Sequence, residues 1–270
     1  MNRARVTAGR VVALERSLSH RDLAIVATLD RVRLATGAQL LRLHGGDGPR
    51  RSVIRGMQRT LTRLIALRVL ARLNRTVGGV RAGSSGHVYA LDTAGQRIAS
   101  GCGPAGGRRL RRPWTPGAAF VAHQLAVTEL YVELREAEPT TRLDLLDFWA
   151  EPLCWRTFIG LGGARTVLKP DAFVRVGLGG VEDLYFVEVD RATQSLPAIG
   201  RKATVYRRYF QTGREQERWG VFPKVLFLVP SEARREALVD LLGRQPAADW
   251  DLFQVACQSD ALELISHEEG

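Results

Sequence analysis

The two halves of this chain carry opposite net charge. Residues 1–117 contain 22 arginines and five acidic residues, a net charge of +17, whereas residues 118–270 contain 17 basic and 23 acidic residues, a net charge of −6. The segment 100–117 is rich in glycine and proline and contains four arginines, a composition typical of a linker. We therefore expect two modules, of which the first attracts a polyanion.

Composition excludes several classes of protein. Of the 270 residues, 45% are hydrophobic and 25% are charged, which is ordinary for a globular protein and excludes disorder over most of the length. No segment approaches the roughly 18 uninterrupted apolar residues of a membrane-spanning helix. The basic segment 1–17 lacks an apolar signal core of about 7 to 15 residues. The sequence thus predicts a cytoplasmic protein without a membrane partner, with a basic N-terminal tail over 1–17.

Motifs for zinc and nucleotide binding are absent. Cys102, Cys154 and Cys257 are far apart and form no CxxC pair, so we expect free thiols in a reducing compartment. The five histidines lack the close spacing of zinc ligands. The GLGG run at 177–180 lies between two expected strands and is interpreted as a turn, and no phosphate-binding loop of an ATPase occurs.

Three helices are expected in the first module. Ser19 is placed to cap a helix over 20–32, with Asp22 as its acidic partner. Thr36 is placed to cap a second, ending before a run of glycines at 45–48. Pro49 suits the first turn of a third helix, whose apolar residues recur at helical spacing.

A hairpin follows the third helix. Two short runs with β-favouring residues flank a Gly/Ser-rich tip that contains Arg75 and Arg81. Three helices followed by a hairpin with a basic tip is the order of a winged helix-turn-helix, which we place at 18–99. Its third helix would then lie in the major groove of double-stranded DNA.

The third helix carries five arginines on its polar face, four of them at strict four-residue spacing. Such a single-signed row can contact phosphates, and one or two side chains can reach guanine edges. The alternative is that the row is only the solvated face of an amphipathic helix. The candidate DNA-binding residues are Arg50, Arg51, Arg55, Arg59, Arg63, Arg75 and Arg81.

The second module, 118–262, is expected to be α/β with a mixed central sheet, so that the whole chain is α+β. A long helix over 118–137 comes first. Strands are then expected near 148–155, 165–176, 181–191, 223–230 and 251–256, with helices near 196–213 and 232–244.

Acidic residues inside these apolar strands are the candidate chemical site. Glu188 and Asp190 share one face of a strand, because side chains alternate with period two, and Asp171 lies on the neighbouring strand. Three converging carboxylates are costly to ionise together unless a cation neutralises them. Oxygen ligands of this kind suit Mg²⁺ or Mn²⁺. Lys202, on the next helix, adds positive charge beside a transition state.

Each of these residues also has a structural interpretation. Asp171 and Glu188 can pair with strand-end arginines such as Arg175 and Arg191, and Asp190 can cap the turn that follows it. Lys202 can be a solvated helix residue. Tyr206 and Tyr209 are expected to pack on the sheet, although either can stack on a base.

The second module resembles the PD-(D/E)XK nuclease core. The resemblance lies in KPDA, then 17 residues to EVD, between one helix with Glu129 and another with Lys202 and Tyr206. It implies that Asp171 and Glu188 are metal ligands, with Glu129 as a helper from the first helix. The usual lysine, two residues after the strand glutamate, is replaced here by Asp190. Lys202 matches members that recruit lysine from the following helix.

The chain as a whole is similar to the replication-relaxation family of bacterial plasmids and mobile elements, over roughly residues 18–230. The similarity lies in RDLAIVATLDRVRLATGAQLLRL, GSSGHVYALDTAG, HQLAVTELYVEL and the segment from EVDRATQS to RKATVYRRY. It implies a DNA context, at the nucleoid or a plasmid, more strongly than it implies a reaction.

Two functional hypotheses follow. In the first, the winged helix docks DNA and the second module is a Mg²⁺- or Mn²⁺-dependent endonuclease or nickase acting in replication or relaxation. Asp171, Glu188 and Asp190 then hold the metal and Lys202 stabilises the transition state. In the alternative, the second module is a degenerate nuclease and the chain is a non-catalytic regulator or accessory protein. A homodimer, and a relaxase or replication protein as partner, are open in both.

Overall fold

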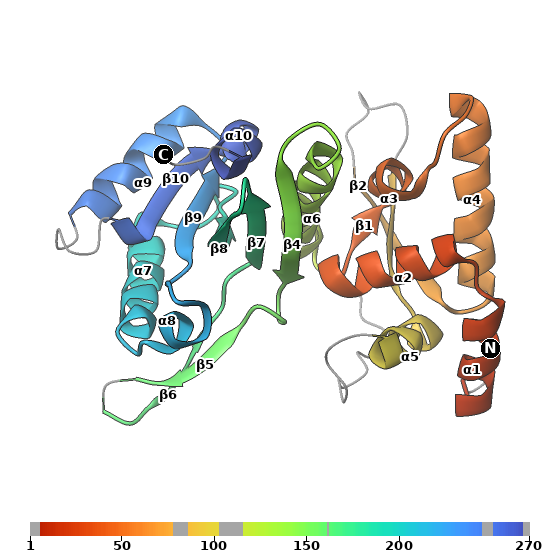
Figure 1. The fold of residues 1–270 in the computed structure, drawn as a ribbon, viewed down its shortest axis with the longest axis horizontal. Coiled ribbons are helices and arrows are strands. Elements are labelled where there is room, and N and C mark those ends of the chain that lie inside the picture. Colours follow the sequence, from red (N-terminus) through yellow and green to blue (C-terminus); the bar gives the residue numbers. More distant parts are fainter. Residues whose placement is uncertain (1–5, 78–85, 103–115, 161, 245–250, 267–270) are drawn as a thin grey trace. The chain divides into compact units, whose positions relative to one another are not determined.

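The computed structural model describes residues 6–77, 86–102, 116–160, 162–244 and 251–266. It is α+β, as expected, and contains a mixed five-stranded sheet (Figure 1). The chain divides into two compact units, residues 1–132 and 133–270. The boundary therefore falls inside helix α6 (Ala118–Ala137) rather than in the expected linker at 100–117, of which residues 103–115 lie outside the described part.

The first part of α6 belongs to the first unit because it buries apolar side chains there. Val121 and Leu125 pack with Leu34 and Val88 in one buried cluster. The hydroxyl of Thr128 donates a hydrogen bond to the carbonyl oxygen of Leu34, at 2.6 Å. The composition of residues 103–115 predicted a linker between the two units. These contacts instead extend the first unit into α6.

The expected helix order of the first unit is confirmed. Ser19 and Thr36 each form a capping box, the first with Asp22 and the second with Gln39, which satisfies amide groups that a helix start leaves unpaired. Pro49 was expected in the first turn of the third helix and is its N-cap, one residue before Arg50. The elements are α1 (Ala8–Ser17), α2 (His20–Val32), β1 (Ala35–Thr36), α3 (Gly37–His44), α4 (Arg50–Ala66), β2 (Leu70–Val77), β3 (Gly86–Leu91) and α5 (Thr93–Cys102).

The expected hairpin is the pair β2 and β3, which are antiparallel and which β1 joins on the far side of β3. Its tip, residues 78–85 with Arg81, lies outside the described residues, and only the backbone of Arg75 is described. The unit's core is formed by buried side chains from all its helices and by Leu70 and Tyr89 of the hairpin.

Two helices of this unit differ from the expectation. The segment 1–17 is not a tail over its whole length, since α1 spans Ala8–Ser17 and buries Leu14 in the core. Helix α5 was not expected, and it buries Ala94, Ile98 and Ala99 in the same core. Both helices are short and gain their stability from tertiary packing. So few residues contain too few apolar positions for their spacing to predict a helix.

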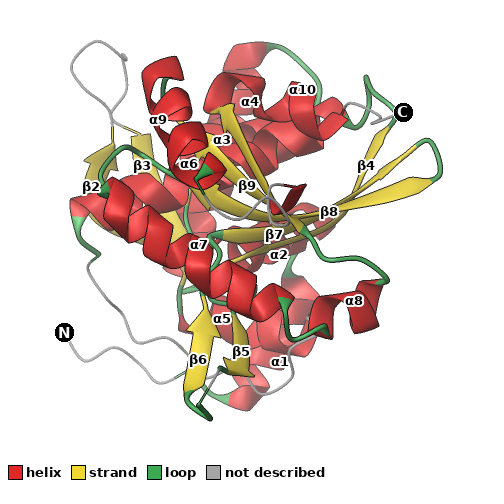
Figure 2. Ribbon diagram, turned by 90° about the vertical axis from the view of Figure 1, so that its left-hand side faces the viewer, coloured by secondary structure: helices red, strands yellow, loops and turns green. Residues whose placement is uncertain are grey.

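The second unit is built on a sheet of strand order β10-β9-β8-β7-β4. The pairs β4/β7 and β7/β8 are antiparallel, whereas β8/β9 and β9/β10 are parallel. The strands are β4 (Leu143–Ala150), β7 (Ala172–Leu178), β8 (Val181–Val189), β9 (Lys224–Val229) and β10 (Phe253–Cys257). A separate hairpin of β5 (Arg156–Ile159) and β6 (Arg165–Leu168) extends away from this sheet (Figures 1 and 2).

Helices α7 (Leu196–Phe210) and α9 (Glu232–Gly243) bury one face of this sheet. Ile199, Ala203, Tyr206 and Tyr209 of α7 share a buried cluster with sheet residues and with α9. The packing of Tyr206 and Tyr209 is as expected. The remaining helices are α8 (Arg214–Trp219), the 3₁₀ turn η2 (Gln258–Asp260) and α10 (Ala261–Ser266).

The segment expected as one strand over 165–176 is two strands in different sheets. Leu168 ends β6 and Ala172 begins β7, with Pro170 between them. Proline has no amide hydrogen and cannot donate to a sheet ladder, so the strand breaks there.

None of the helices in the described part of the chain combines the length and the apolar composition of a membrane-spanning segment.

Candidate functional site

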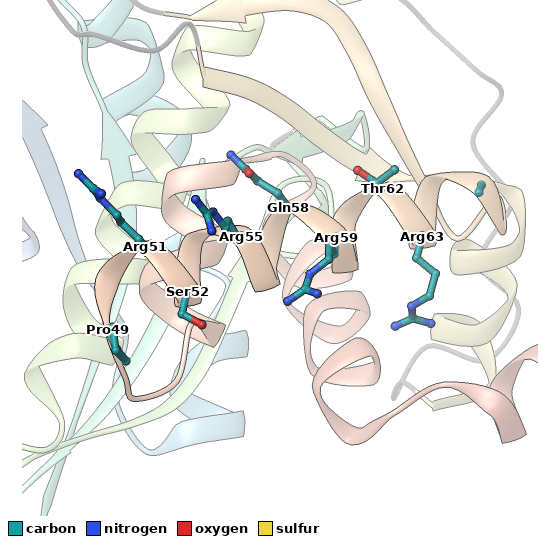
Figure 3. A pocket seen from close by; sticks show the side chains of 9 residues that line it. Pro49, Arg51, Ser52, Arg55, Gln58, Arg59, Thr62 and Arg63 are labelled. Carbon is teal, nitrogen blue, oxygen red and sulfur yellow. The ribbon is translucent and has the colours of Figure 1, made fainter.

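The first candidate site is the polar face of α4. Arg51, Arg55 and Arg59 are exposed, and none of them has an acidic partner among the described residues. The helix contains no acidic residue. Figure 3 shows these side chains projecting from the helix into a shallow depression along it. The face therefore presents uncompensated positive charge to solvent.

Arg63, the fourth member of the predicted row, is engaged within the protein. Its Nη2 donates hydrogen bonds to both carboxylate oxygens of Asp22, at 2.6 and 2.7 Å. Asp22 is 1% exposed. Burial alone would raise the pKa of Asp22, but the hydrogen bonds from Arg63 and Ser19 outweigh burial and hold this pKa below its ordinary value. The pair thus links the start of α2 to α4.

The other predicted DNA-binding residues are placed unequally. Arg50 is exposed at the start of α4. Arg75 lies on β2, but its side chain is outside the described part of the chain, as is the whole of Arg81. Arg50, Arg51, Arg55 and Arg59 are therefore the exposed arginines of α4 that have no acidic partner among the described residues, and we call them the α4 arginine face.

The second candidate site is a carboxylate cluster at one end of β7 and β8. Asp171 directly precedes β7, and its amide N donates to the carbonyl oxygen of Val187, at 3.0 Å. Its Oδ2 accepts a hydrogen bond from the amide N of Val189, at 2.8 Å. Because the two strands are antiparallel neighbours, Asp171 and Glu188 lie at the same end of the hairpin, as the sequence predicted.

Glu188 is 2% exposed and has two side-chain partners on α7. Its Oε2 forms an ion pair with Lys202, and its Oε1 accepts a hydrogen bond from the hydroxyl of Tyr206, at 2.6 Å. Lys202 is therefore not a solvated helix residue. Its four-residue spacing from Tyr206 places both side chains on one face of α7, a signal in the sequence that would have found Tyr206 as the second partner.

The electrostatics of this cluster leave negative charge only partly compensated. Burial raises the pKa of Glu188 to about 7, against the opposing charge of Lys202, and the charge of Asp171 raises it further. Burial alone would lower the pKa of Lys202, but the charges of Glu188 and Asp171 outweigh burial and raise it. One lysine thus faces two carboxylates.

Asp190 is held by different residues from those that hold Glu188. Its Oδ2 accepts a hydrogen bond from Nε of Arg234, at 2.6 Å, and its Oδ1 accepts one from the amide N of Ala192, at 2.9 Å. The hydrogen bond from Ala192 caps the turn after Asp190, which is the structural interpretation of Asp190 given above. Arg234 lies on α9, and sequence reasoning missed it because the two residues are 44 positions apart.

Glu129 was expected to help at the metal site and Arg175 to pair with Asp171 or Glu188. The structure gives both residues other partners. Glu129 belongs to the first unit, where it pairs with Arg42 and accepts a hydrogen bond from Nε2 of Gln39, at 2.8 Å. Its contacts there hold α6 against α3. Arg175 pairs with Asp147 and Glu182, and its guanidinium lies over the ring of Trp219, at 5.2 Å from the centroid.

The carboxylates fit a divalent cation only as a pair. Among the described residues, no group of three His, Cys, Asp or Glu side chains is placed to hold a metal ion. Asp190 is engaged by Arg234, whereas Asp171 and Glu188 share an end of the sheet, where the charge of Asp171 contributes to the raised pKa of Glu188. Mg²⁺ is commonly held by one or two carboxylates and several waters, so Asp171 and Glu188 are the two residues that fit it.

Comparison with known proteins gives one family. A family model described as replication-relaxation matches residues 26–225, more than half of the chain, and it is the family that the sequence motifs resemble. The matched range includes α4 and the carboxylate cluster. No curated protein matches the chain.

Proposed function

This chain belongs to the replication-relaxation family, and from that premise we propose that it binds double-stranded DNA through the α4 arginine face. The family's description associates the chain with replication or relaxation. The observation that carries the proposal is the exposed, acid-free row of Arg51, Arg55 and Arg59. A helix face with unpaired charge of one sign suits phosphates better than it suits another folded protein.

The order of elements in the first unit supports the same proposal. Helix α2, strand β1, helices α3 and α4, and the hairpin of β2 and β3 follow one another as in a winged helix-turn-helix. In that arrangement α4 is the helix that enters the major groove and the hairpin is the wing. The pairing of Arg63 with Asp22 leaves Arg51, Arg55 and Arg59 to meet the DNA.

The salt dependence of binding tests the proposal. Replacing Arg51, Arg55 and Arg59 with alanine should reduce the slope of log affinity against log salt by about 2.7, because each neutralised phosphate contributes about 0.9. Affinity for a duplex is measured from about 50 to about 200 mM salt. The matched control removes three exposed arginines of the second unit, Arg142, Arg165 and Arg208. Equal slopes for the two variants would place the DNA elsewhere.

A second candidate function, metal-dependent cleavage of DNA by the second unit, is supported by its topology. The antiparallel neighbours β4, β7 and β8, followed by α7 and by β9 parallel to β8, agree with the PD-(D/E)XK resemblance, and the hairpin of β5 and β6 is inserted between β4 and β7. Asp171 and Glu188 would hold the ion. A bound Mg²⁺ supplies the Lewis acidity that activates water and polarises a phosphodiester. Lys202 lies beside the pair and can stabilise charge on the phosphate, while Tyr206 orients Glu188.

Metal binding and cleavage test this second candidate together. Titration with Mn²⁺ should show about one ion bound per chain, and both binding and nicking of plasmid DNA should disappear in an Asp171→Ala, Glu188→Ala double variant. Asp144→Ala, which removes an exposed carboxylate of β4, is the control. If the wild type neither binds Mn²⁺ nor cuts, the second unit is a non-catalytic module for dimerisation or for recruiting a replication partner, and DNA binding stands.

A further inference from the structure

Neutral polar side chains lie among the arginines of the α4 arginine face. Ser52, Gln58 and Thr62 are exposed on this helix and line the same depression as the arginines. Charge neutralisation drives non-specific affinity and is independent of sequence. Neutral side chains can bond phosphates as well, but a paired donor and acceptor can also match the edge of a base.

Gln58 is the side chain of this set best suited to that task. Arg51, Arg55, Gln58 and Thr62 are spaced by four, three and four residues, so they form one stripe along the helix. Figure 3 shows Gln58 and Thr62 extending from one flank of α4, and Arg59 and Arg63 from the other. The amide of Gln58 offers one donor and one acceptor side by side, the pattern that matches N6 and N7 of adenine in the major groove.

The packing of α4 leaves this stripe available. Met57, Leu61 and Leu64 bury the opposite face of the helix in the core. The Arg63–Asp22 pair anchors the later part of α4 to α2. The helix that carries Arg51, Arg55 and Gln58 is therefore held on a fixed support. A recognition helix contacts base edges from within the major groove.

We propose that α4 recognises a DNA sequence and that Gln58 is a specificity-determining residue that reads an adenine. This inference rests on the proposed DNA binding and adds a base preference to it. Arg55, one turn earlier on the same stripe, is positioned to contact the neighbouring base pair or its phosphate. The partner is accordingly a duplex with a defined operator, in which an A·T pair faces Gln58.

Selection from duplexes with a randomised centre tests the inference. The full-length wild type should enrich a motif with an adenine at one position. Gln58→Ala should lose the preference at that position alone, and affinity for the selected site should fall by about 5- to 150-fold, the range for one bidentate base contact. Gln58→Arg should change the preferred base at that position from adenine to guanine.

The controls separate this inference from the DNA-binding proposal. Gln211→Ala removes an exposed glutamine of the second unit and should keep the wild-type motif. If the wild type binds duplex but enriches no motif, or if Gln58→Ala enriches the same motif, the inference is wrong and DNA binding stands. If the wild type binds no duplex at all, both are overturned.

Discussion

Glu215→Ala should lower the free energy of unfolding of the second unit by about 3–5 kcal/mol at neutral pH, the range for breaking a buried ion pair. Glu215 is 2% exposed and lies on α8. Three donors converge on its carboxylate: Nε of Arg156 at 2.7 Å, the hydroxyl of Tyr209 at 2.6 Å and Nε1 of Trp219 at 2.9 Å. No water can replace this acceptor for all three.

The loss is large because Arg156 would keep its charge without an acidic partner, and the carbonyl oxygen of Cys154, which accepts a hydrogen bond from its Nη1 at 2.8 Å, is uncharged. Its side chain is 12% exposed, and its guanidinium lies over the rings of Trp149, Phe173 and Phe186 at 5.3–5.8 Å from their centroids. Ring contacts stabilise a cation only in part, and the rest of the desolvation cost would be uncompensated.

Urea denaturation of the wild type and the variant measures this difference. Glu217→Ala is the matched control, because it removes an exposed carboxylate of the same short helix and should change stability by less than about 0.5 kcal/mol. Similar values for the two variants would contradict the role of Glu215 as the central acceptor. The network also includes Tyr209 of α7, the helix that carries Lys202.

Glu188→Gln should change how stability depends on pH. The ordinary pKa of a glutamate is 4.5, and burial raises the pKa of Glu188 in the folded chain to about 7. The folded chain therefore holds this proton more tightly than the unfolded chain does. The stabilisation that results is complete below about pH 4.5 and is lost as the pH rises through about 7.

The expected result is a change in the difference between the two proteins. The free energy of unfolding of Glu188→Gln, minus that of the wild type, should rise by about 3 kcal/mol between pH 4.5 and 8, since one pKa unit corresponds to about 1.4 kcal/mol. Denaturation is followed without divalent ions across that range. Glu217→Gln should show no such rise. A difference that is constant with pH would mean that Glu188 is ionised throughout, with Lys202 as a full counter-charge.

Local features of the first unit could be predicted from the sequence. Ser19 and Thr36 cap α2 and α3 as expected, because a cap depends on residues within one turn of the helix start. The row of arginines on α4 follows from spacing alone. The boundary between the units did not follow from composition, because Val121 and Leu125 pack into the first unit after a segment that looks like a linker.

Part of the carboxylate cluster could be predicted, because it depends on the spacing of residues within neighbouring strands. Strand periodicity and a tight hairpin placed Asp171 and Glu188 at one end of two neighbouring strands. Periodicity also placed Asp190 with them, but Arg234 of α9 holds its carboxylate instead. Helical spacing pointed to Lys202 as a residue of α7 without revealing that Glu188 is its partner.

Which side chains share a face of each helix or strand follows from the amino-acid sequence, because it depends on the backbone repeat of one element. Which of these side chains meet follows from the tertiary packing. Arg63 pairs with Asp22 across 41 positions, and Glu129 binds Gln39 across 90. Such pairs depend on how distant elements pack, and burial decides which charges need a partner within the protein. The packing thereby separated Arg63, which supports the fold, from Arg51, Arg55 and Arg59, which stay exposed.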